Sequence, residues 1–200
     1  MPSKVAFLDY QVIDHLHRMA NGIYKGQHVD ALRLFEFEAL MGHYELWMAE
    51  ITQVEMIIGR ENPRIDPDRI PEFAQRDQAK LAIAERLGVR WLGYPCSKTD
   101  DQYSRLDVSF RIAGPDWAIA EAFEQRIEQM PGVSVGDARQ VASLIYGFDD
   151  ADVSFRPEIQ WLVTEDEPLR AALRREINAG QLTELSQIQV VSVAELVAAS

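Results

Sequence analysis

The sequence has very little cysteine and no long hydrophobic run, and both shortages narrow what the protein can be. Cys96 is the one cysteine among 200 residues, so the chain can form neither an internal disulfide nor a thiolate cluster for zinc. The apolar runs are far shorter than the roughly 20 residues of a membrane helix. Asp9 interrupts the start before a signal-peptide core can form. We therefore expect a cytoplasmic protein that makes no membrane contact.

Positive charge and nucleotide-binding motifs are also scarce. The formal net charge is −12, and a surface this acidic repels phosphate backbones unless a metal or a local basic patch intervenes. No Gly-x-Gly-x-x-Gly or P-loop pattern is present, which argues against a nucleotide cofactor. The remaining composition, 47% hydrophobic and 26% charged, is that of a globular domain, and no linker or repeat divides it. We expect one domain over residues 1–200.

Short apolar runs rich in β-branched and aromatic residues alternate with helical patterns. Five of them predict strands: Val5–Leu8, Tyr44–Met48, Val89–Leu92, Ile159–Val163 and Ile188–Ser192. Helical spacing recurs between them, as in Ala138, Val141, Ala142 and Ile145, or Ile119, Phe123, Ile127 and Met130. Every gap is long enough for a parallel crossover, so an α/β fold is predicted, a three-layer α/β/α arrangement around a roughly five-stranded parallel sheet.

Two stretches are less regular. Residues 94–115 are predicted to be an insertion or flap with a possible extra strand, and residues 60–71 contain three prolines.

Acidic residues follow the predicted strands at the edge where open parallel sheets bind ligands. Asp9 directly follows the first strand, Glu55 lies on the helix after the second, and Asp166 comes shortly after the fourth. Asp137 opens the helix that leads to the fourth strand. Converging carboxylates raise one another's pKa, and a hard divalent cation relieves the repulsion, so four acids predict a Mg²⁺ or Mn²⁺ site. Such a site is suited to phosphodiester hydrolysis.

Each acid also has a purely structural interpretation. Aspartates before helices are favoured N-caps, which applies to Asp9 and Asp137. The segments Thr52 to Glu55 and Thr164 to Glu167 both fit the capping-box pattern. Taken one at a time, capping or surface solvation is the better interpretation, and only the joint pattern favours a metal site.

The same segments, in order, resemble the motifs of the PIN domain nucleases. Val5 to Ile13 is similar to the family's opening strand with its metal-binding Asp, here Asp9. Thr52, Glu55 and Gly59 match the spacing of the second motif; Asp137-Ala138 resembles the third, and Thr164-Glu-Asp166 the fourth. The resemblance implies a ribonuclease whose metal is held by Asp9, Glu55, Asp137 and Asp166, with Thr164 orienting ligands or water.

The resemblance to PIN nucleases also implies partners, and two positions of this sequence differ from the family's motif. It suggests RNA as the substrate, the toxin role of a toxin-antitoxin pair with an antitoxin protein as partner, and a homodimer. Tyr10 and Gln11 replace the small hydroxyl residue and the Asn that usually follow the first Asp, so hydrogen bonding around Asp9 must differ. This departure and the charge of −12 leave a second hypothesis open, a PIN-like interaction module with weak or no catalysis.

Other motifs carry weaker signals. Gly132-Val-Ser134-Val-Gly136 matches a nucleophile elbow, but a helix rather than a strand is predicted before it and no histidine follows it, so a loop before a helix is predicted instead. His15 and His17 lack further metal-ligand spacing and are expected to be solvated. Arg60, Arg139 and Arg156 suit either phosphate contacts or a solvated surface. The tryptophans are expected in the core.

Overall fold

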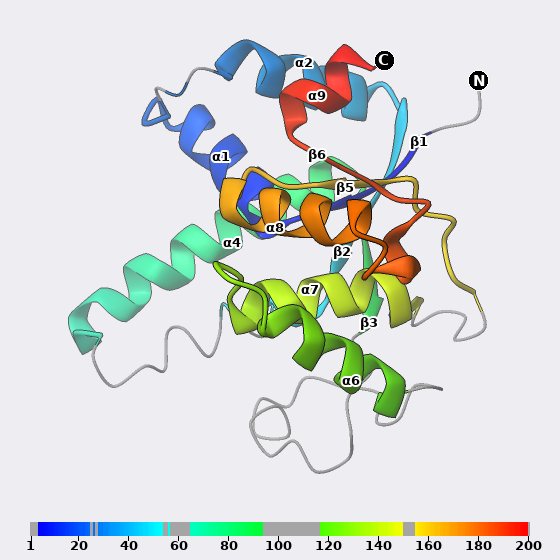
Figure 1. The fold of residues 1–200 in the computed structure, drawn as a ribbon. Helices are drawn as coiled ribbons and strands as arrows, with labels where there is room; N and C mark the ends of the chain where they lie inside the picture. Colours follow the sequence, from blue (N-terminus) through cyan, green and yellow to red (C-terminus); the bar gives the residue numbers. More distant parts are fainter. Residues whose placement is uncertain are drawn as a thin grey trace.

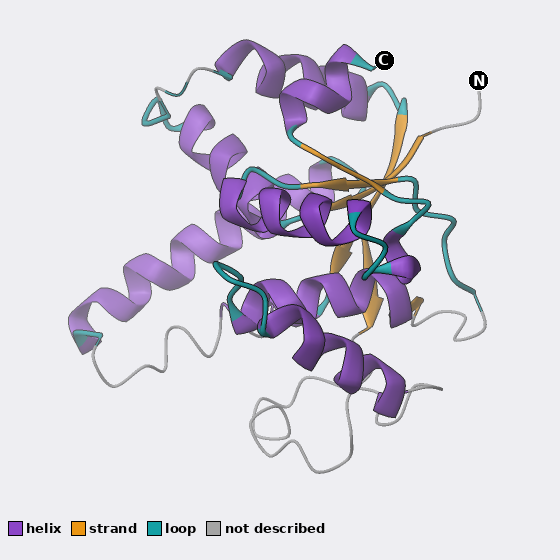
Figure 2. Cartoon of the chain, in the orientation of Figure 1, coloured by secondary structure: helices purple, strands orange, loops and turns teal. Residues whose placement is uncertain are grey.

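The computed structural model describes residues 4–24, 26, 28–53, 56, 65–93, 117–149 and 155–199. Strands and helices alternate along the chain in this part (Figures 1 and 2). The strands are β1 (Lys4–Leu8), β2 (Tyr44–Ala49), β3 (Arg90–Gly93), β4 (Phe148–Asp149), β5 (Trp161–Val163) and β6 (Gln189–Val191). The longer helices are α1 (Tyr10–Ala20), α2 (Val29–Leu40), α4 (Ile70–Arg86), α6 (Trp117–Glu128), α7 (Val135–Tyr146) and α8 (Glu167–Asn178). Shorter helical segments are η1 (Pro67–Arg69), η2 (Thr183–Leu185) and α9 (Val193–Ala198).

The strands form one sheet in the order β4-β3-β2-β1-β5-β6. All pairs are parallel except the pair of β3 with β4, which is antiparallel at the edge. The five strands expected from the apolar runs are confirmed, and so is their parallel pairing. The two-residue strand β4 was not predicted, because so short a segment carries no periodic pattern of its own.

Helices cover both faces of the sheet, as the alternation of side chains along each strand requires. In β1, Phe7 faces a core formed with α6, α7 and α8, whereas Ala6 and Leu8 face a core formed with α1, α2, α4 and α9. Both cores are closed to solvent, with Phe7, Ala6 and Leu8 fully buried. The predicted α/β architecture with helices on either side of the sheet is confirmed to this extent (Figure 1).

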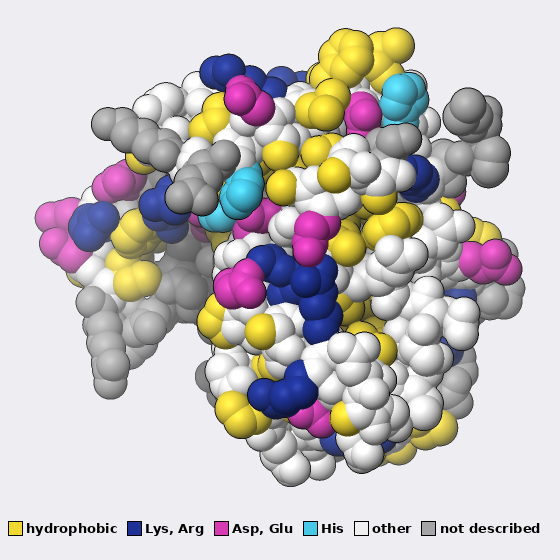
Figure 3. Space-filling model, turned by 45° about the horizontal axis from the view of Figure 1, so that its top comes forward, with side chains coloured by type: hydrophobic (Ala, Val, Ile, Leu, Met, Phe, Trp, Pro, Cys, Tyr) yellow, Lys and Arg dark blue, Asp and Glu magenta, His cyan; other side chains and the backbone are white. Residues whose placement is uncertain are grey.

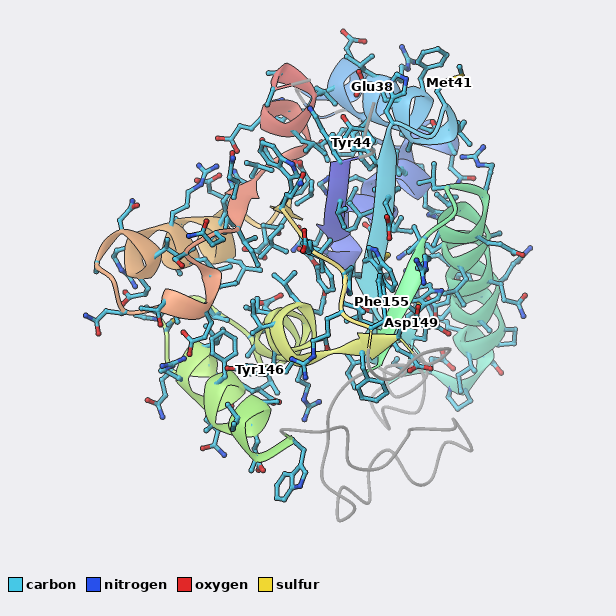
Figure 4. All side chains as sticks on the ribbon, turned by 90° about the vertical axis from the view of Figure 1, so that its right-hand side faces the viewer. Glu38, Met41, Tyr44, Tyr146, Asp149 and Phe155 are labelled. Carbon is cyan, nitrogen blue, oxygen red and sulfur yellow. The ribbon has the colours of Figure 1, made fainter. Side chains whose placement is uncertain are left out.

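The edge of the sheet at β4 is fixed by a glycine and an arginine. A Cβ on Gly147 would lie 2.2 Å from the backbone oxygen of Ser143, so only glycine lets the chain leave α7 and enter β4 at this point. Arg90 lies over the Trp47 ring, with its Cζ 4.1 Å from the ring centroid, and donates a hydrogen bond to Asp149. Asp149 and Phe155 lie side by side beyond β3 (Figure 4).

Some expectations about single residues were wrong. Ile119 is 56% exposed, because the buried face of α6 is made by Ala120, Phe123 and Ile127, and Trp117 at the start of that helix is also exposed. The proline-containing stretch expected to be irregular up to residue 71 gives way to α4 at Ile70. The predicted insertion at 94–115 and Cys96 lie outside the described residues. Among the helices described, none has the length and apolarity needed to cross a membrane.

Candidate functional site

The order of the strands reverses between β1 and β5. From β1 the chain adds β2 and β3 on one side, and then places β5 and β6 on the other. In open α/β sheets the crevice at such a reversal, beyond the carboxyl ends of the strands, is the usual ligand site. Asp9 follows β1 and Thr164 follows β5, and the two strand ends are joined by a hydrogen bond from the Asp9 N–H to the Val163 oxygen at 2.9 Å.

A short hydrogen-bond chain connects Asp9, Thr164 and Asp166 at this reversal. The Thr164 hydroxyl donates to Asp9 Oδ2 at 2.6 Å and accepts from the backbone N–H of Asp166 at 3.0 Å. Thr164 is fully buried and Asp9 is 4% exposed. The threonine therefore holds the first acid in place and accepts a hydrogen bond from the backbone of the second, whereas the expected role of Thr164 in orienting ligands or water stays a prediction.

Gln11 links the same two acids from the first turn of α1. Its side-chain Nε2 donates to Asp166 Oδ2 at 2.9 Å, and its backbone N–H lies 3.5 Å from Asp9 Oδ1. The other oxygen of Asp166, Oδ1, accepts from the N–H of Leu169 at 2.9 Å. Asp9 caps α1 and Asp166 caps α8, so both aspartates are helix N-caps as well as candidate ligands. The capping box expected from Thr164 to Glu167 is wrong, because Asp166 takes the cap position.

Asp9 is electrostatically strained in this position. The pKa of Asp9 is raised to about 6: burial is the largest cause, the charges of Asp137 and Asp166 also raise it, and the hydrogen bonds from Thr164 and Gln11 lower it. Asp137 and Asp166 therefore lie close enough for their charges to affect the pKa of Asp9. Either protonation of the carboxylate or a bound cation would remove the cost of holding a buried negative charge beside other acids.

Asp137 lies near Asp9 but is held by its own helix. Its Oδ2 accepts from the Ser134 backbone N–H at 2.9 Å and from the Ser134 hydroxyl at 2.6 Å, while the Asp137 N–H donates to the Ser134 Oγ at 3.1 Å. This reciprocal pair is a capping box, with Ser134 as the N-cap of α7. Asp137 is therefore the third residue of the helix rather than its cap. The prediction that Ser134 precedes a helix and is not a nucleophile elbow is confirmed.

The second predicted motif is described only in part. Glu55 lies outside the described residues, whereas Thr52 is 2% exposed in the helical turn after β2, and its Oγ1 has no hydrogen-bond partner in the described ranges. Within those ranges no three acidic, histidine or cysteine side chains come together closely enough to hold a metal ion. The structure thus brings Asp9, Thr164 and Asp166 together and places Asp137 within electrostatic reach of Asp9.

Tyr10 extends the site towards α4 and α7, in a direction that no sequence pattern predicts. Its backbone N–H lies 3.4 Å from Gln140 Oε1 on α7, and its hydroxyl accepts from Lys80 Nζ on α4 at 2.5 Å. Lys80 also pairs with Asp14 Oδ1 at 2.5 Å. Both partners of Tyr10 lie 70 or more residues away in the sequence, so no local pattern could have found them.

Two of the three arginines considered as phosphate contacts bond to other protein groups, and His15 is partly buried. Arg139 pairs with Glu124 at 3.3 Å, and Arg156 donates to the Ile145 oxygen at 3.4 Å, while Arg60 lies outside the described residues. His15 is not simply solvated, since it is partly buried against Tyr24, with ring centroids 4.8 Å apart.

Comparison with family models, with curated proteins and with solved structures finds no match to this chain. The likeness to PIN nucleases therefore rests on the motifs in the sequence.

Proposed function

We propose that this protein is a Mg²⁺- or Mn²⁺-dependent endoribonuclease that hydrolyses phosphodiester bonds at the acids beyond β1 and β5. The observation that supports the proposal most directly is the buried Asp9, hydrogen-bonded to Thr164 and raised in pKa by burial and by Asp137 and Asp166, at the reversal of strand order. Ligand sites of open α/β sheets lie at such reversals. RNA rather than DNA comes from the family resemblance alone.

The chemistry of the side chains is compatible with a hard divalent cation. Asp9 and Asp166 offer carboxylate oxygens, and the hydroxyl of Thr52, unpartnered within the described residues, lies just after the neighbouring strand β2. A third acidic ligand would have to be Glu55, or Asp137 after release from Ser134. When bound, such an ion activates water and stabilises charge on phosphate oxygens. Thr164 would hold Asp9 in its position, and Gln11 would fix the orientation of Asp166.

The test is cleavage of a labelled RNA by the purified protein in Mn²⁺. Asp9→Asn and Asp166→Asn should each lower the rate roughly 100-fold or more, because a metal contributes several kcal/mol to the transition state. Asp30→Asn is the matched control, since it removes the same charge from a fully exposed aspartate on α2. Equal rates for wild type, Asp9→Asn and Asp166→Asn would assign the activity to a contaminant and end the proposal.

The competing function is a PIN-like interaction module without catalysis. It is favoured by the net charge of −12 and by the fact that Asp9 and Asp166 are already bonded to protein donors in the described residues. Thermal unfolding and calorimetric titration with millimolar Mn²⁺ separate the two. A ligand that binds only the folded state raises its stability, so an absent heat signal together with an unchanged melting temperature would favour the module.

A further inference from the structure

One face of α4, with its N-cap, carries three cationic side chains and one aromatic side chain. Arg69 caps the helix, and Phe73, Arg76 and Lys80 follow at spacings that place all four on one helical face. We refer to these four residues as the α4 stripe. The stripe is a local group of positive charge on a chain with a net charge of −12.

The outer part of the stripe is a stack of two guanidinium groups on one ring. The Cζ atoms of Arg69 and Arg76 each lie 4.8 Å from the centroid of Phe73. Arg69 and Glu72 form an ion pair at 3.7 Å in which both side chains are more than half exposed, so solvent screens it strongly. Arg76 is exposed and forms no ion pair within the described ranges. A positive charge and flat surfaces for stacking are therefore both accessible here.

The inner end of the stripe meets the candidate site. Lys80 is buried, and its ammonium group contacts the hydroxyl of Tyr10, the residue after Asp9, while Asp14 neutralises its charge. Burial, and then the positive charges of Lys80 and Arg76, lower the pKa of His17 on the facing helix α1. The amino-terminal half of α4 projects away from the sheet (Figure 1). The stripe thus runs from a projecting tip to the residue beside Asp9.

We propose that the α4 stripe binds single-stranded RNA and leads it to the acids beyond β1 and β5. This inference rests on the proposed nuclease function and names how its substrate is held. Arginines bind phosphates through their paired N–H groups, and bases of single strands stack on aromatic rings and on guanidinium planes. Lys80 is an anchor for the stripe and is too deeply buried to contact RNA itself.

The arginines of α8 are less suited to this role because glutamates neutralise them. On α8, Arg170 bonds to Glu167, Arg174 bonds to Glu195 at 2.7 Å, and Arg175 bonds to Glu176 at 2.8 Å. Lys and Arg side chains form separate local groups on the face shown in Figure 3, including one on the part that projects to the left. The absence of an ion pair to Arg76 in the described ranges and its contact with Phe73 distinguish the α4 stripe from the arginines of α8.

The experiment is fluorescence anisotropy of a labelled single-stranded RNA with the full chain in EDTA, at several salt concentrations. Arg69→Gln together with Arg76→Gln should weaken binding about tenfold or more and reduce the salt slope by about 0.7 for each phosphate that is no longer bound. Phe73→Leu should weaken binding about fivefold to tenfold without changing the salt slope, because stacking involves no ion release. Arg33→Gln, an exposed arginine on α2, is the matched control and should leave both quantities unchanged. Circular dichroism establishes that each variant is folded.

The outcomes separate this inference from the proposed function. Equal weakening by Arg33→Gln would show an effect of net charge alone and overturn the stripe, as would a wild-type protein that binds no RNA at low salt. Unchanged RNA binding by Phe73→Leu would mark a general anion site and overturn the assignment to RNA. If stripe variants lose RNA binding but the wild type cleaves no RNA in Mn²⁺, the proposal that the α4 stripe binds RNA is supported and the proposed nuclease function is rejected. If the wild type cleaves RNA and the stripe variants bind and cleave RNA equally well, the proposed nuclease function is supported and the proposed role of the α4 stripe is rejected.

Discussion

At the scale of single residues, the buried carboxylate of Asp9 carries a cost in stability. Its folded-state pKa of about 6 lies above its ordinary value of 3.8, so between these pH values the folded protein holds the proton more tightly than the unfolded chain does. Stability therefore falls as pH rises from about 4 to about 6. Above that range the ionised Asp9 costs the folded protein about 3 kcal/mol.

Asp9→Asn should therefore stabilise the metal-free protein at neutral pH. Asparagine does not ionise, is an equally good N-cap for α1, and its amide oxygen still accepts from Thr164. We expect the variant to exceed wild type in unfolding free energy by about 1–3 kcal/mol at pH 7.5, with the difference vanishing towards pH 4. Urea unfolding across this pH range in EDTA measures it.

The matched control for Asp9→Asn is Asp30→Asn, which removes the same charge from a fully exposed side chain. If Asp9→Asn is less stable than wild type at every pH, then the carboxylate is a structural cap and its burial carries no cost. A variant that is more stable yet inactive would instead indicate that the position is retained for chemistry.

At the scale of elements, a buried charge joins α1 to α4. The Lys80 side chain is 3% exposed, whereas its partner Asp14 is 26% exposed and also lies 3.8 Å from Arg18. The two ends of this ion pair are therefore not equivalent. Within the described residues, a lysine left alone in this position keeps only the hydroxyl and the ring of Tyr10 as partners, while an aspartate left alone keeps water and Arg18.

Asp14→Ala should therefore destabilise the protein more than Lys80→Met does. We expect a loss of about 3–5 kcal/mol for Asp14→Ala, the cost of a buried unpaired charge, and a smaller loss for Lys80→Met. The double variant should lose less than the sum of the two, because it leaves no charge unpaired. Denaturant unfolding of all four proteins measures this, and strict additivity would show that the two side chains do not interact.

The sequence predicted the elements whose pattern lies within one short segment, and it did not predict those that depend on contacts between distant segments. Apolar runs identified the five parallel strands. The rule that ligands bind beyond strand ends pointed to Asp9 and Asp166, which are connected by hydrogen bonds through Thr164 and Gln11, while their role as metal ligands stays a prediction. Strand β4 forms because it pairs with β3, and a sequence of two residues does not predict that pairing. The cap of α8 is Asp166 rather than Thr164, because the threonine hydroxyl is directed to Asp9 instead.

The same limit applies to the surroundings of the site. Gln11 and Tyr10 were recognised as departures from the PIN motif, but their partners Asp166, Lys80 and Gln140 lie 70 to 155 residues away. The packing of α1 against α4, and the placement of Gln140 on α7 and of Asp166 at the start of α8, determine which side chains meet there. Substitutions after Asp9 therefore replace one set of hydrogen bonds by another, rather than leaving the acid without support.

At the scale of the whole molecule, the charge of −12 makes stability and RNA binding respond to salt in opposite directions. Self-repulsion of a strongly acidic chain is screened by salt, with a Debye length of about 30 Å at 0.01 M and about 10 Å at 0.1 M. We expect NaCl to raise the melting temperature at pH 7.5 and to have a much smaller effect near pH 4.8, the isoelectric point of the sequence. Differential scanning fluorimetry over a salt series at both pH values measures this.

Opposite signs allow the two effects to be told apart in one preparation. Salt weakens a phosphate contact because bound counterions are no longer released into a dilute solution, so RNA affinity should fall over the range in which the melting temperature rises. If the melting temperature fell as well, the surface ion pairs of the protein would outweigh its self-repulsion. If affinity falls while the fold becomes more stable, the attraction for RNA must come from local cations, which an overall charge of −12 would otherwise conceal.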